Sequence, residues 1–263
     1  MSSMASTASA PTSPTTTTAP AATPAGPEYT AAIAGSRAQI RAAQRLRHQV
    51  FGEEMGATLT SPLAGHDIDA VDDLADHLVV THTATQEVVG TYRLLPPGRS
   101  PRLYSDGEFD LTALDALRPS LIEAGRSCVH PAHRGGAVIN QMWAALARYT
   151  LLSGHRYLAG CASVPLGDGG TAAAHAWELG RTRYAAPPGL RVTPHRPWRP
   201  TVPAPGRPAL APLPPLLRGY LRIGARICGA PAHDPDFDVA DFFVVLDMEQ
   251  LGDRYRRYFL GER

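Results

Sequence analysis

The stretch Leu121–Trp143, LIEAGRSCVHPAHRGGAVINQMW, places the strongest constraint on the fold of this chain. It predicts a strand that ends near Val129, a basic glycine turn and then a helix. The first turn of a helix has free backbone N–H groups, and the helix dipole favours a negative charge there, so this turn is a candidate phosphate site. Glu123 lies just upstream on the strand. The combination suggests transfer of a group that is carried on a phosphate-tailed thioester. The residues expected at the phosphate are Val129, His133, Arg134, Gly135, Gly136 and Ala137.

The glycine turn alone is only modestly specific, because short glycine patterns often arise by chance in plain strand-to-helix turns. Its position between an apolar strand and an amphipathic helix favours the functional interpretation.

Composition narrows the class of protein. The 24 acidic and 25 basic residues nearly cancel, so no global field would recruit nucleic acid. Cys128, Cys161 and Cys228 lack metal-site spacing and are expected to be reduced thiols, as in the cytosol. The chain shows neither a secretory signal nor a membrane-spanning run. We expect a cytoplasmic protein that at most contacts the inner face of the membrane peripherally.

The order of predicted elements favours an α/β domain with a mixed sheet. Residues 1–27 are mostly Ser, Thr, Ala and Pro and should be a disordered tail, while 28–263 should form one domain. Ser36 is a plausible N-cap for the first helix. Later segments are a hairpin (77–81 and 87–95), a short turn and helix (108–117), a strand (121–130), a helix (137–153), a strand (157–163), a helix (172–179), a helix (215–228) and a strand (241–247). The Pro-rich residues 186–215 should be an irregular insertion rather than packed structure.

Glu123 and Arg126 are the candidate catalytic pair. Side chains alternate along a regular strand, so residues three apart would face opposite ways. Gly125 permits a β-bulge, which could return both side chains to one face. The carboxylate could then take a proton from a nucleophilic amine while the guanidinium tunes it. A structural ion pair is the alternative.

Arg93 lies among apolar residues of a predicted strand and must be paired or face a cleft. Its partner would be either a substrate carboxylate or a protein acid such as Glu123. The nearby loop carries four aspartates and lacks the glycine and distal glutamate of a calcium-binding EF-hand, but it could bind a substrate ammonium. Cys128 is a weak candidate nucleophile. The aspartates are Asp67, Asp69, Asp72 and Asp73.

Two sets of arginines at four-residue spacing form basic stripes on predicted helices. Each stripe is either a solvated face or a contact for an acidic carrier protein or anionic lipid. The sets are Arg37, Arg41 and Arg45, and Arg218, Arg222 and Arg226.

With these residues in hand, the chain resembles GNAT-fold acyltransferases, and more closely the acyl carrier protein-dependent ornithine N-acyltransferase (haemolysin-like) family. The likeness covers about residues 36–260 and rests on RLRHQVFGEEMG, VVGTYRLL, EAGRSCVHPAHRGGAVINQMW, YLAGCAS and PPLLRGYLRIGARICGAPAHDPDFDVADFFVVLD. It implies a mixed, mostly antiparallel sheet flanked by helices. A fainter resemblance links the chain to acyl-homoserine-lactone synthases. That likeness rests on Phe51, Arg45 or Arg47, Asp67, Asp69, Arg93, Glu123 and Arg126.

The glycine turn departs from the usual GNAT phosphate loop, Gln/Arg-x-x-Gly-x-Gly/Ala, because the glycines directly follow Arg134 and the last position is the bulky Ile139. A reduced loop suits the single phosphate of phosphopantetheine better than a coenzyme A pyrophosphate. We therefore expect acyl carrier protein rather than acyl-CoA as donor, with no permanently bound cofactor and no metal.

The resemblance implies transfer of a (3-hydroxy)acyl chain to the α-amine of ornithine or a similar amino acid, the first step of ornithine-type aminolipid synthesis. Glu123 would be the base, Arg93 or Arg126 would bind the amino acid carboxylate, and Phe51, Asp67 and Asp69 would contribute to the substrate site. Two alternatives remain: an acyl-homoserine-lactone-type synthase that uses S-adenosylmethionine, and a non-catalytic acyl-binding or membrane-active protein.

Overall fold

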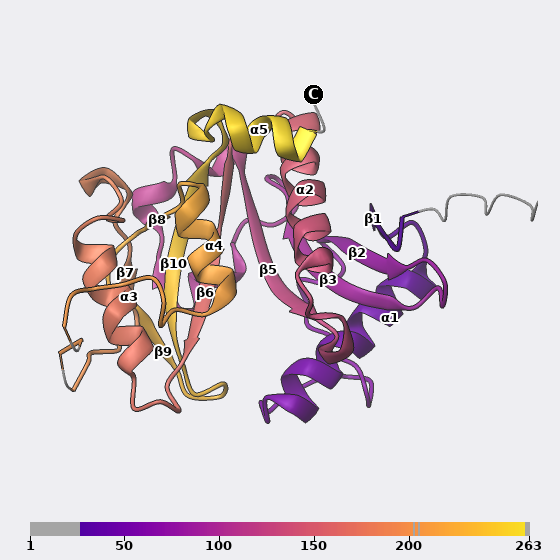
Figure 1. Cartoon of the computed structure of the whole chain (residues 1–263), viewed down its shortest axis with the longest axis horizontal. Coiled ribbons are helices and arrows are strands. Elements are labelled where there is room, and N and C mark those ends of the chain that lie inside the picture. The colour runs from indigo at the N-terminus through magenta and orange to yellow at the C-terminus, as the bar shows by residue number, and fades with distance from the viewer. Residues whose placement is uncertain (1–26, 202, 205, 261–263) are drawn as a thin grey trace, which may run out of the picture.

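The computed structural model describes residues 27–260 apart from 202 and 205, and its centre is one twisted eight-stranded sheet (Figure 1). The order is β1-β2-β3-β5-β6-β10-β8, with β9 also paired to β10. Every neighbouring pair is antiparallel except β5 and β6. The mixed, mostly antiparallel sheet predicted from the sequence is therefore confirmed. The strands are β1 (Tyr29–Ile33), β2 (Asp76–His82), β3 (Val88–Leu95), β5 (Leu121–Val129), β6 (Tyr157–Pro165), β8 (Arg226–Ile227), β9 (Ala232–Asp234) and β10 (Val239–Asp247).

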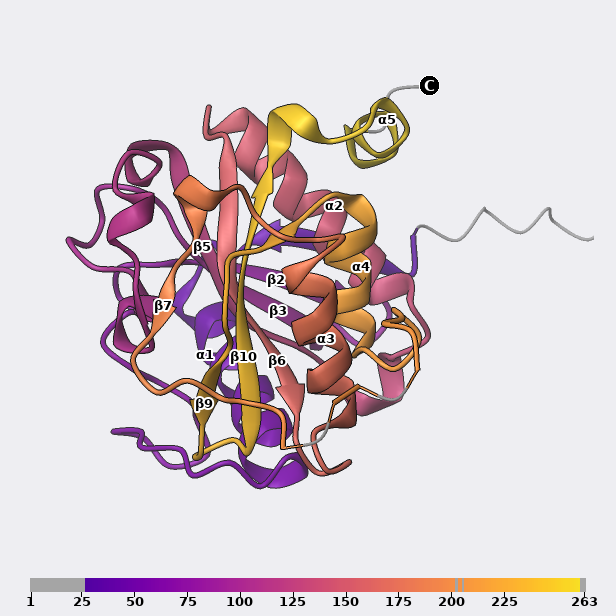
Figure 2. The same cartoon turned by 90° about the vertical axis from the view of Figure 1, so that its left-hand side faces the viewer.

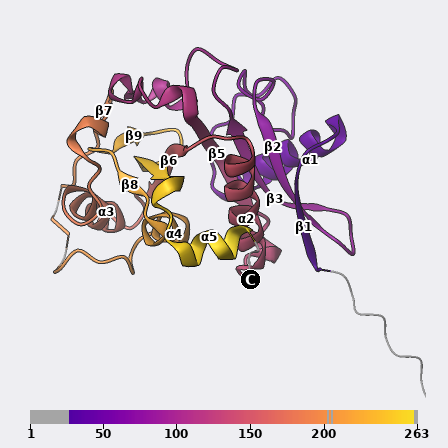
Figure 3. The ribbon, with the colours of Figure 1, turned by 90° about the horizontal axis from the view of Figure 1, so that it is seen from above.

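Helices cover both faces of this sheet, as the view from above shows (Figure 3). On one face lie α1 (Arg37–Arg47), its π-helical continuation η1 (His48–Glu54) and the turns of residues 104–120. The opposite face carries α2 (Ala137–Leu152), α3 (Thr171–Arg181), α4 (Pro215–Ile223) and α5 (Asp253–Leu260). Figure 2 shows α3 and α4 side by side over β6 and β10. A two-stranded sheet, β4 (Phe109–Asp110) with β7 (Thr193–Pro194), lies beyond the main one.

The 3-10 turns are η2 (Tyr104–Gly107), η3 (Thr112–Leu114), η4 (Arg118–Ser120), η5 (Pro131–His133), η6 (Pro188–Leu190) and η7 (Met248–Gln250). Residues 108–117, predicted as a short turn and helix, form a two-residue strand and a single 3-10 turn.

Local signals in the sequence place several elements correctly. Ser36 caps α1, because its hydroxyl oxygen accepts the backbone N–H of Gln39 at 3.3 Å. The hairpin, α2, β6 and β10 lie where they were predicted. The strand β1 and the helix α5 were not anticipated. The predicted helix 215–228 is wrong beyond Ile223, because Gly224 adopts φ 110° and ends it, so Arg226 lies on a strand.

The Pro-rich residues 186–215 are mostly irregular, but the expectation that they lie outside the packed structure is wrong at four positions. Ala186, Val192, Pro194 and Leu213 are buried, and the N–H of Val192 donates to the Cys228 carbonyl at 2.7 Å. Apolar side chains at these points cover the edge of the sheet. The predicted disordered tail lies outside the described residues except for Pro27.

The two halves of the sheet separate between β5 and β6. These strands pair only over Leu121–Tyr157, Ile122–Leu158 and Glu123–Ala159, and then diverge (Figure 1). At Gly160 the backbones still approach closely, since a Cβ there would lie 2.2 Å from the carbonyl oxygen of Ala124. Beyond this point the sheet is open, and the site lies in that opening.

Candidate active site

A cleft of about 550 Å³ lies where β5 and β6 diverge. It is lined from both halves of the sheet, by η1 and η2, and by the turn between β9 and β10. The predicted residues Phe51, Arg93, Glu123, Arg126, Val129 and Arg134 all contribute to its walls. Six residues that were predicted as site residues thus line one cavity, whereas His133, Gly135, Gly136, Ala137, Asp67 and Asp69 do not line it.

Glu123 lies at the last position of β5 that pairs with β6, and it is 5% exposed. One carboxylate oxygen accepts the backbone N–H of Tyr104 at 2.5 Å, and the other accepts that of Ser105 at 2.8 Å. Burial raises the pKa of Glu123, and these hydrogen bonds together with the charge of Arg93 offset only part of that effect. A raised pKa suits a group that must accept a proton near neutral pH.

The predicted bulge is present. Thr91 pairs with Cys128 and Arg93 with Gly125, so Arg126 and Ser127 together oppose Tyr92. The left-handed residue is Arg126 itself, with φ 50°, an uncommon conformation for a residue other than glycine. The bulge directs the Arg126 side chain into the cleft that Glu123 also lines.

Arg126 and Glu123 nevertheless form no ion pair within residues 27–260, so the expectation that this guanidinium holds Glu123 is wrong. Arg126 instead lies against the rings of Phe51, Tyr104 and Phe237, with its central carbon 5.2–5.9 Å from their centroids. Its Nε is buried and donates no hydrogen bond.

Arg93 has protein partners. Its Nη1 donates to Asp69 at 2.6 Å and to Asp72 at 3.3 Å. The fully buried Arg47 binds Asp67 and Asp72, each at 2.8 Å. The aspartate loop is thus neutralised by arginines from α1, β3 and β5, which leaves it little capacity for a substrate ammonium.

The predicted phosphate turn precedes α2. Gly136 adopts φ 95° at the N-cap of the helix, a conformation that glycine favours. Arg134 is 45% exposed and donates two hydrogen bonds to Glu54, at 2.5 and 2.7 Å, and a third to the Val129 carbonyl. His133 contacts Tyr29 rather than the cleft. Arg134 is therefore the side chain at this turn that faces the cleft, and Glu54 competes with a phosphate for it.

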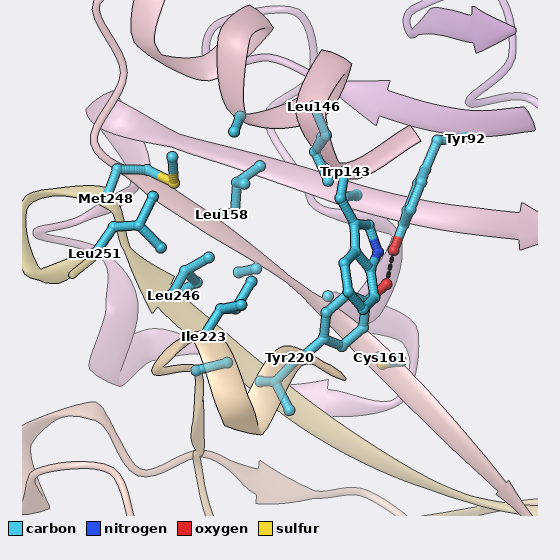
Figure 4. Close-up of a pocket in the computed structure, with 16 residues that line it drawn as sticks. Tyr92, Trp143, Leu146, Leu158, Cys161, Tyr220, Ile223, Leu246, Met248 and Leu251 are labelled. Carbon is cyan, nitrogen blue, oxygen red and sulfur yellow. Dashed lines mark hydrogen bonds between the residues drawn. The ribbon is translucent and has the colours of Figure 1, made fainter. Parts of the chain in front are cut away.

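A second, apolar cavity of about 60 Å³ lies on the other side of the opening (Figure 4). Figure 4 shows Trp143 and Leu146 reaching it from α2, and Ile223 and Tyr220 from α4. Tyr92 hydrogen-bonds Tyr220 through their hydroxyl groups at one end. Tyr92, Ala124 and Cys161 line both cavities, so an elongated ligand could extend from the polar cleft into the apolar one.

One wall of the cleft is acidic, and it was not predicted from the sequence. Asp241 on β10 is 3% exposed and accepts a hydrogen bond from Ser163 at 2.6 Å. Glu108 follows η2, and the Cys161 thiol lies 3.8 Å from it. Asp241 could have been predicted from the sequence, because it begins the apolar run DFFVVLD. Like Arg93, a charged residue in an apolar strand must be paired or face a cleft. No comparable signal marks Glu108.

The weaker candidates occupy structural positions. Burial raises the pKa of Cys128 to about 12, which fits an inert thiol. On α4 the apolar side chains Leu217, Leu221 and Ile223 are buried in the core, so they are not free to enter a lipid surface. Within the described residues, no helix is both long and apolar enough to cross a bilayer.

The chain is similar to several known proteins. Residues 46–144 match the family model described as acetyltransferase (GNAT) domain. An L-ornithine N(alpha)-acyltransferase of Brucella abortus (strain 2308) is 36% identical over 88% of this chain and 88% of its own. The enzyme of the same name from Rhodobacter capsulatus is also 36% identical, over 88% of this chain and 94% of its own.

Solved structures show the same fold at lower identity. The AHL synthase LasI superposes with a TM-score of 0.53 at 14% identity, covering 90% of this chain and 96% of its own. The N-acyl amino acid synthase FeeM gives 0.52 at 14% identity, covering 85% and 94%.

Proposed function

Because this chain belongs to the L-ornithine N(alpha)-acyltransferase family, we propose that it transfers a (3-hydroxy)acyl chain from acyl carrier protein to the α-amine of ornithine. This reaction would be the first step of ornithine-type aminolipid synthesis. One observation supports it above the others: the buried carboxylate of Glu123 lines the polar cleft, and the next residue, Ala124, lines both that cleft and the apolar cavity.

The donor's thioester would lie between β5 and β6, with its acyl chain in the apolar cavity and its phosphate at the start of α2. A chain of this kind gains free energy as its methylene groups leave water. The turn offers one arginine and a single helix start, which suits one phosphate. We therefore favour phosphopantetheine on acyl carrier protein over acyl-CoA.

The amino acid would enter the polar cleft. Its carboxylate would meet Arg126 rather than Arg93. Arg126 lies 3.6 Å from Asp67 and Asp69, and its Nε donates no hydrogen bond. Arg93, in contrast, donates to Asp69 at 2.6 Å and to Asp72 at 3.3 Å. The α-amine is mostly protonated at neutral pH and must lose a proton before it attacks. Glu123, directly or through water, accepts that proton.

The amine nitrogen then attacks the thioester carbonyl carbon. A new C–N bond forms, and the negative charge that develops on oxygen is stabilised by backbone N–H groups at the bulge. Collapse of the tetrahedral intermediate breaks the C–S bond and releases a thiolate, which needs no strong acid to leave. The thiolate then takes the second proton of the attacking nitrogen, so the products are an amide and a thiol, and the first proton remains on Glu123 until it passes to solvent.

Exposed arginines on α1, Arg37 and Arg45, offer charge complementarity to an acidic carrier protein. Because the product would be amphiphilic, we also propose transient contact with the inner membrane face during its release.

Incubation with 3-hydroxyacyl carrier protein and ornithine tests the proposal directly. We expect thiol release that depends on ornithine, and mass spectrometry should find N(alpha)-acylornithine. Thiol release that requires S-adenosylmethionine would instead establish an autoinducer synthase. A complete lack of transfer with both acceptors would favour a non-catalytic acyl-binding protein.

Replacement of Arg134 by alanine should raise KM for acyl carrier protein by roughly tenfold, because a charge-assisted contact to the phosphate is lost. KM for ornithine should change much less. Steady-state kinetics with each substrate varied in turn measures both values. The matched variant is Glu54→Gln, which frees Arg134 and should leave the donor KM equal or lower. A larger effect of Arg134→Ala on ornithine than on the carrier would refute this placement of the donor.

Replacement of Ala147 by leucine should shorten the accepted acyl chain. Ala147 is buried in α2 and lines the apolar cavity, so a larger side chain would occupy space needed by distal methylenes. We expect the ratio of kcat/KM for a long-chain to a short-chain donor to fall roughly tenfold. Ala38→Leu, on the exposed side of α1, is the control. An unchanged ratio would place the acyl chain elsewhere.

A further inference from the structure

We propose that Glu108 and Asp241 form the binding site for the side-chain ammonium of the acceptor amino acid, and so determine its specificity. This inference rests on the proposed function, since it assigns a second recognition point within the same cleft.

The two acids come from separate parts of the fold and face one cavity. Asp241 lies on β10 opposite Ser163 of β6, and its Oδ1 accepts the Ser163 hydroxyl at 2.6 Å. Glu108 immediately follows η2, the turn whose N–H groups hold Glu123. Both acids line the cleft that Glu123 lines.

The thiol of Cys161 connects this acidic wall to the base. It lies 3.3 Å from the Ser105 hydroxyl and 3.8 Å from Glu108. Ser105 is also the residue whose backbone N–H binds Glu123. The pair therefore lies within a short chain of contacts from the carboxylate that would accept the proton.

The two carboxyl groups hydrogen-bond to each other and share one proton, which leaves the pair with one negative charge. Within residues 27–260, as far as they are described, no arginine, lysine or histidine forms an ion pair with Glu108 or Asp241. Asp241 is nonetheless 97% shielded from solvent and directed into the cleft. Burial raises the pKa of Asp241, and the positive charge of Arg126 lowers it electrostatically, without a direct contact. A buried carboxylate without a cation is costly, so a cationic ligand at this position would relieve that cost.

The pKa values agree with this geometry. Burial, with the repulsion of Asp241 and Asp234 added, raises the pKa of Glu108 to about 8. Burial raises that of Asp241 to about 6. Both directions indicate that the cleft lacks a positive charge at this wall.

The opposite wall is different in this respect. It is lined by Arg93 and Arg126, and the aspartates behind these arginines, Asp67, Asp69 and Asp72, are each within 4 Å of an arginine nitrogen. The cleft thus has an arginine side, which can bind a carboxylate at Arg126, and an unneutralised acidic side. An amino acid with a cationic side chain matches this arrangement of charge. Its carboxylate would lie at Arg126, its side-chain ammonium at the acidic wall, and its α-amine at Glu123 between them.

The wild-type enzyme tests this without any substitution. Norvaline has the carbon chain of ornithine but lacks the terminal ammonium. We expect kcat/KM for ornithine to exceed that for norvaline by roughly a hundredfold or more, because an unpaired polar wall rejects the neutral chain. Equal values would overturn the inference.

The variants Glu108→Gln and Asp241→Asn keep the size of the side chains and replace one carboxyl group of the pair with a neutral amide. In each we expect the ornithine-to-norvaline ratio to fall at least tenfold, whatever the absolute rates. Glu178→Gln on α3, far from the cleft lining, should keep the wild-type ratio. Retention of the full ratio in both folded variants would also overturn the inference.

Calorimetric titration with ornithine alone separates this inference from the proposed reaction. Binding by the wild type that is lost in Asp241→Asn supports the site even if no acyl transfer is found, and in that case only the proposed function fails. Transfer to ornithine and norvaline at equal rates gives the reverse result: the reaction stands and the ammonium site does not.

Discussion

Replacement of Glu123 by glutamine is expected to lower kcat by roughly a hundredfold or more, within the range for loss of a general base. The amide cannot accept the amine proton, although it still fills the buried position on β5. The pH profile gives a second readout: wild-type kcat/KM should rise with pH as the carboxyl group ionises, and that part of the rise should be absent in the variant. Single-turnover rates across a pH series measure both effects.

A structural role must be separated from a chemical one, because Glu123 also accepts the N–H groups of Tyr104 and Ser105. Glu123→Asp keeps a carboxylate, and we expect it to recover part of the activity that Glu123→Gln loses. Thermal unfolding of both variants shows whether the η2 turn has been released. Near-normal turnover of a folded Glu123→Gln protein would remove this residue from the role of base.

Replacement of Arg47 by methionine is expected to destabilise the protein by about 3–5 kcal/mol, since it leaves Asp67 and Asp72 buried without their main cation. For a domain of this size such a loss corresponds to a fall in Tm of roughly 6–20 °C. Calorimetric or dichroism melting measures it.

Arg37→Met gives the matched control, because Arg37 lies on the same helix with its side chain exposed. Its Tm should stay within about 2 °C of wild type, as for most surface changes. Similar melting of both variants would show that the arginine and aspartate network contributes little to stability.

Much of the fold could be predicted, because its signals are local. The N-cap at Ser36 and the apolar periodicity of the first helix need only neighbouring residues to be recognised. The strand β1 was missed because it lies at the sheet edge and its half-buried pattern is weak. The end of α4 was placed too late because apolar residues continue past Gly224 onto β8.

The site was only partly predictable. The bulge between Glu123 and Arg126 could be predicted, because it depends only on the spacing of residues within one strand. The partners of Arg93 do not follow from sequence, since Asp69 and Asp72 reach it from a loop whose path is set by tertiary packing. The proximity of Glu108 and Asp241 does not follow from the sequence either. Glu108 follows the η2 turn and Asp241 lies on β10, and tertiary packing brings these two elements together.

The short parallel contact of β5 with β6 has a mechanical consequence. Within the part of the chain that the structure describes, three backbone-paired positions join the two halves of the sheet, and Glu123 belongs to the last of them. If the two halves of the sheet rotate relative to each other to admit donors of different width, the rotation axis passes near Glu123. A point on a hinge axis moves least, so the proton acceptor would keep its place while the cavity around it widens or narrows.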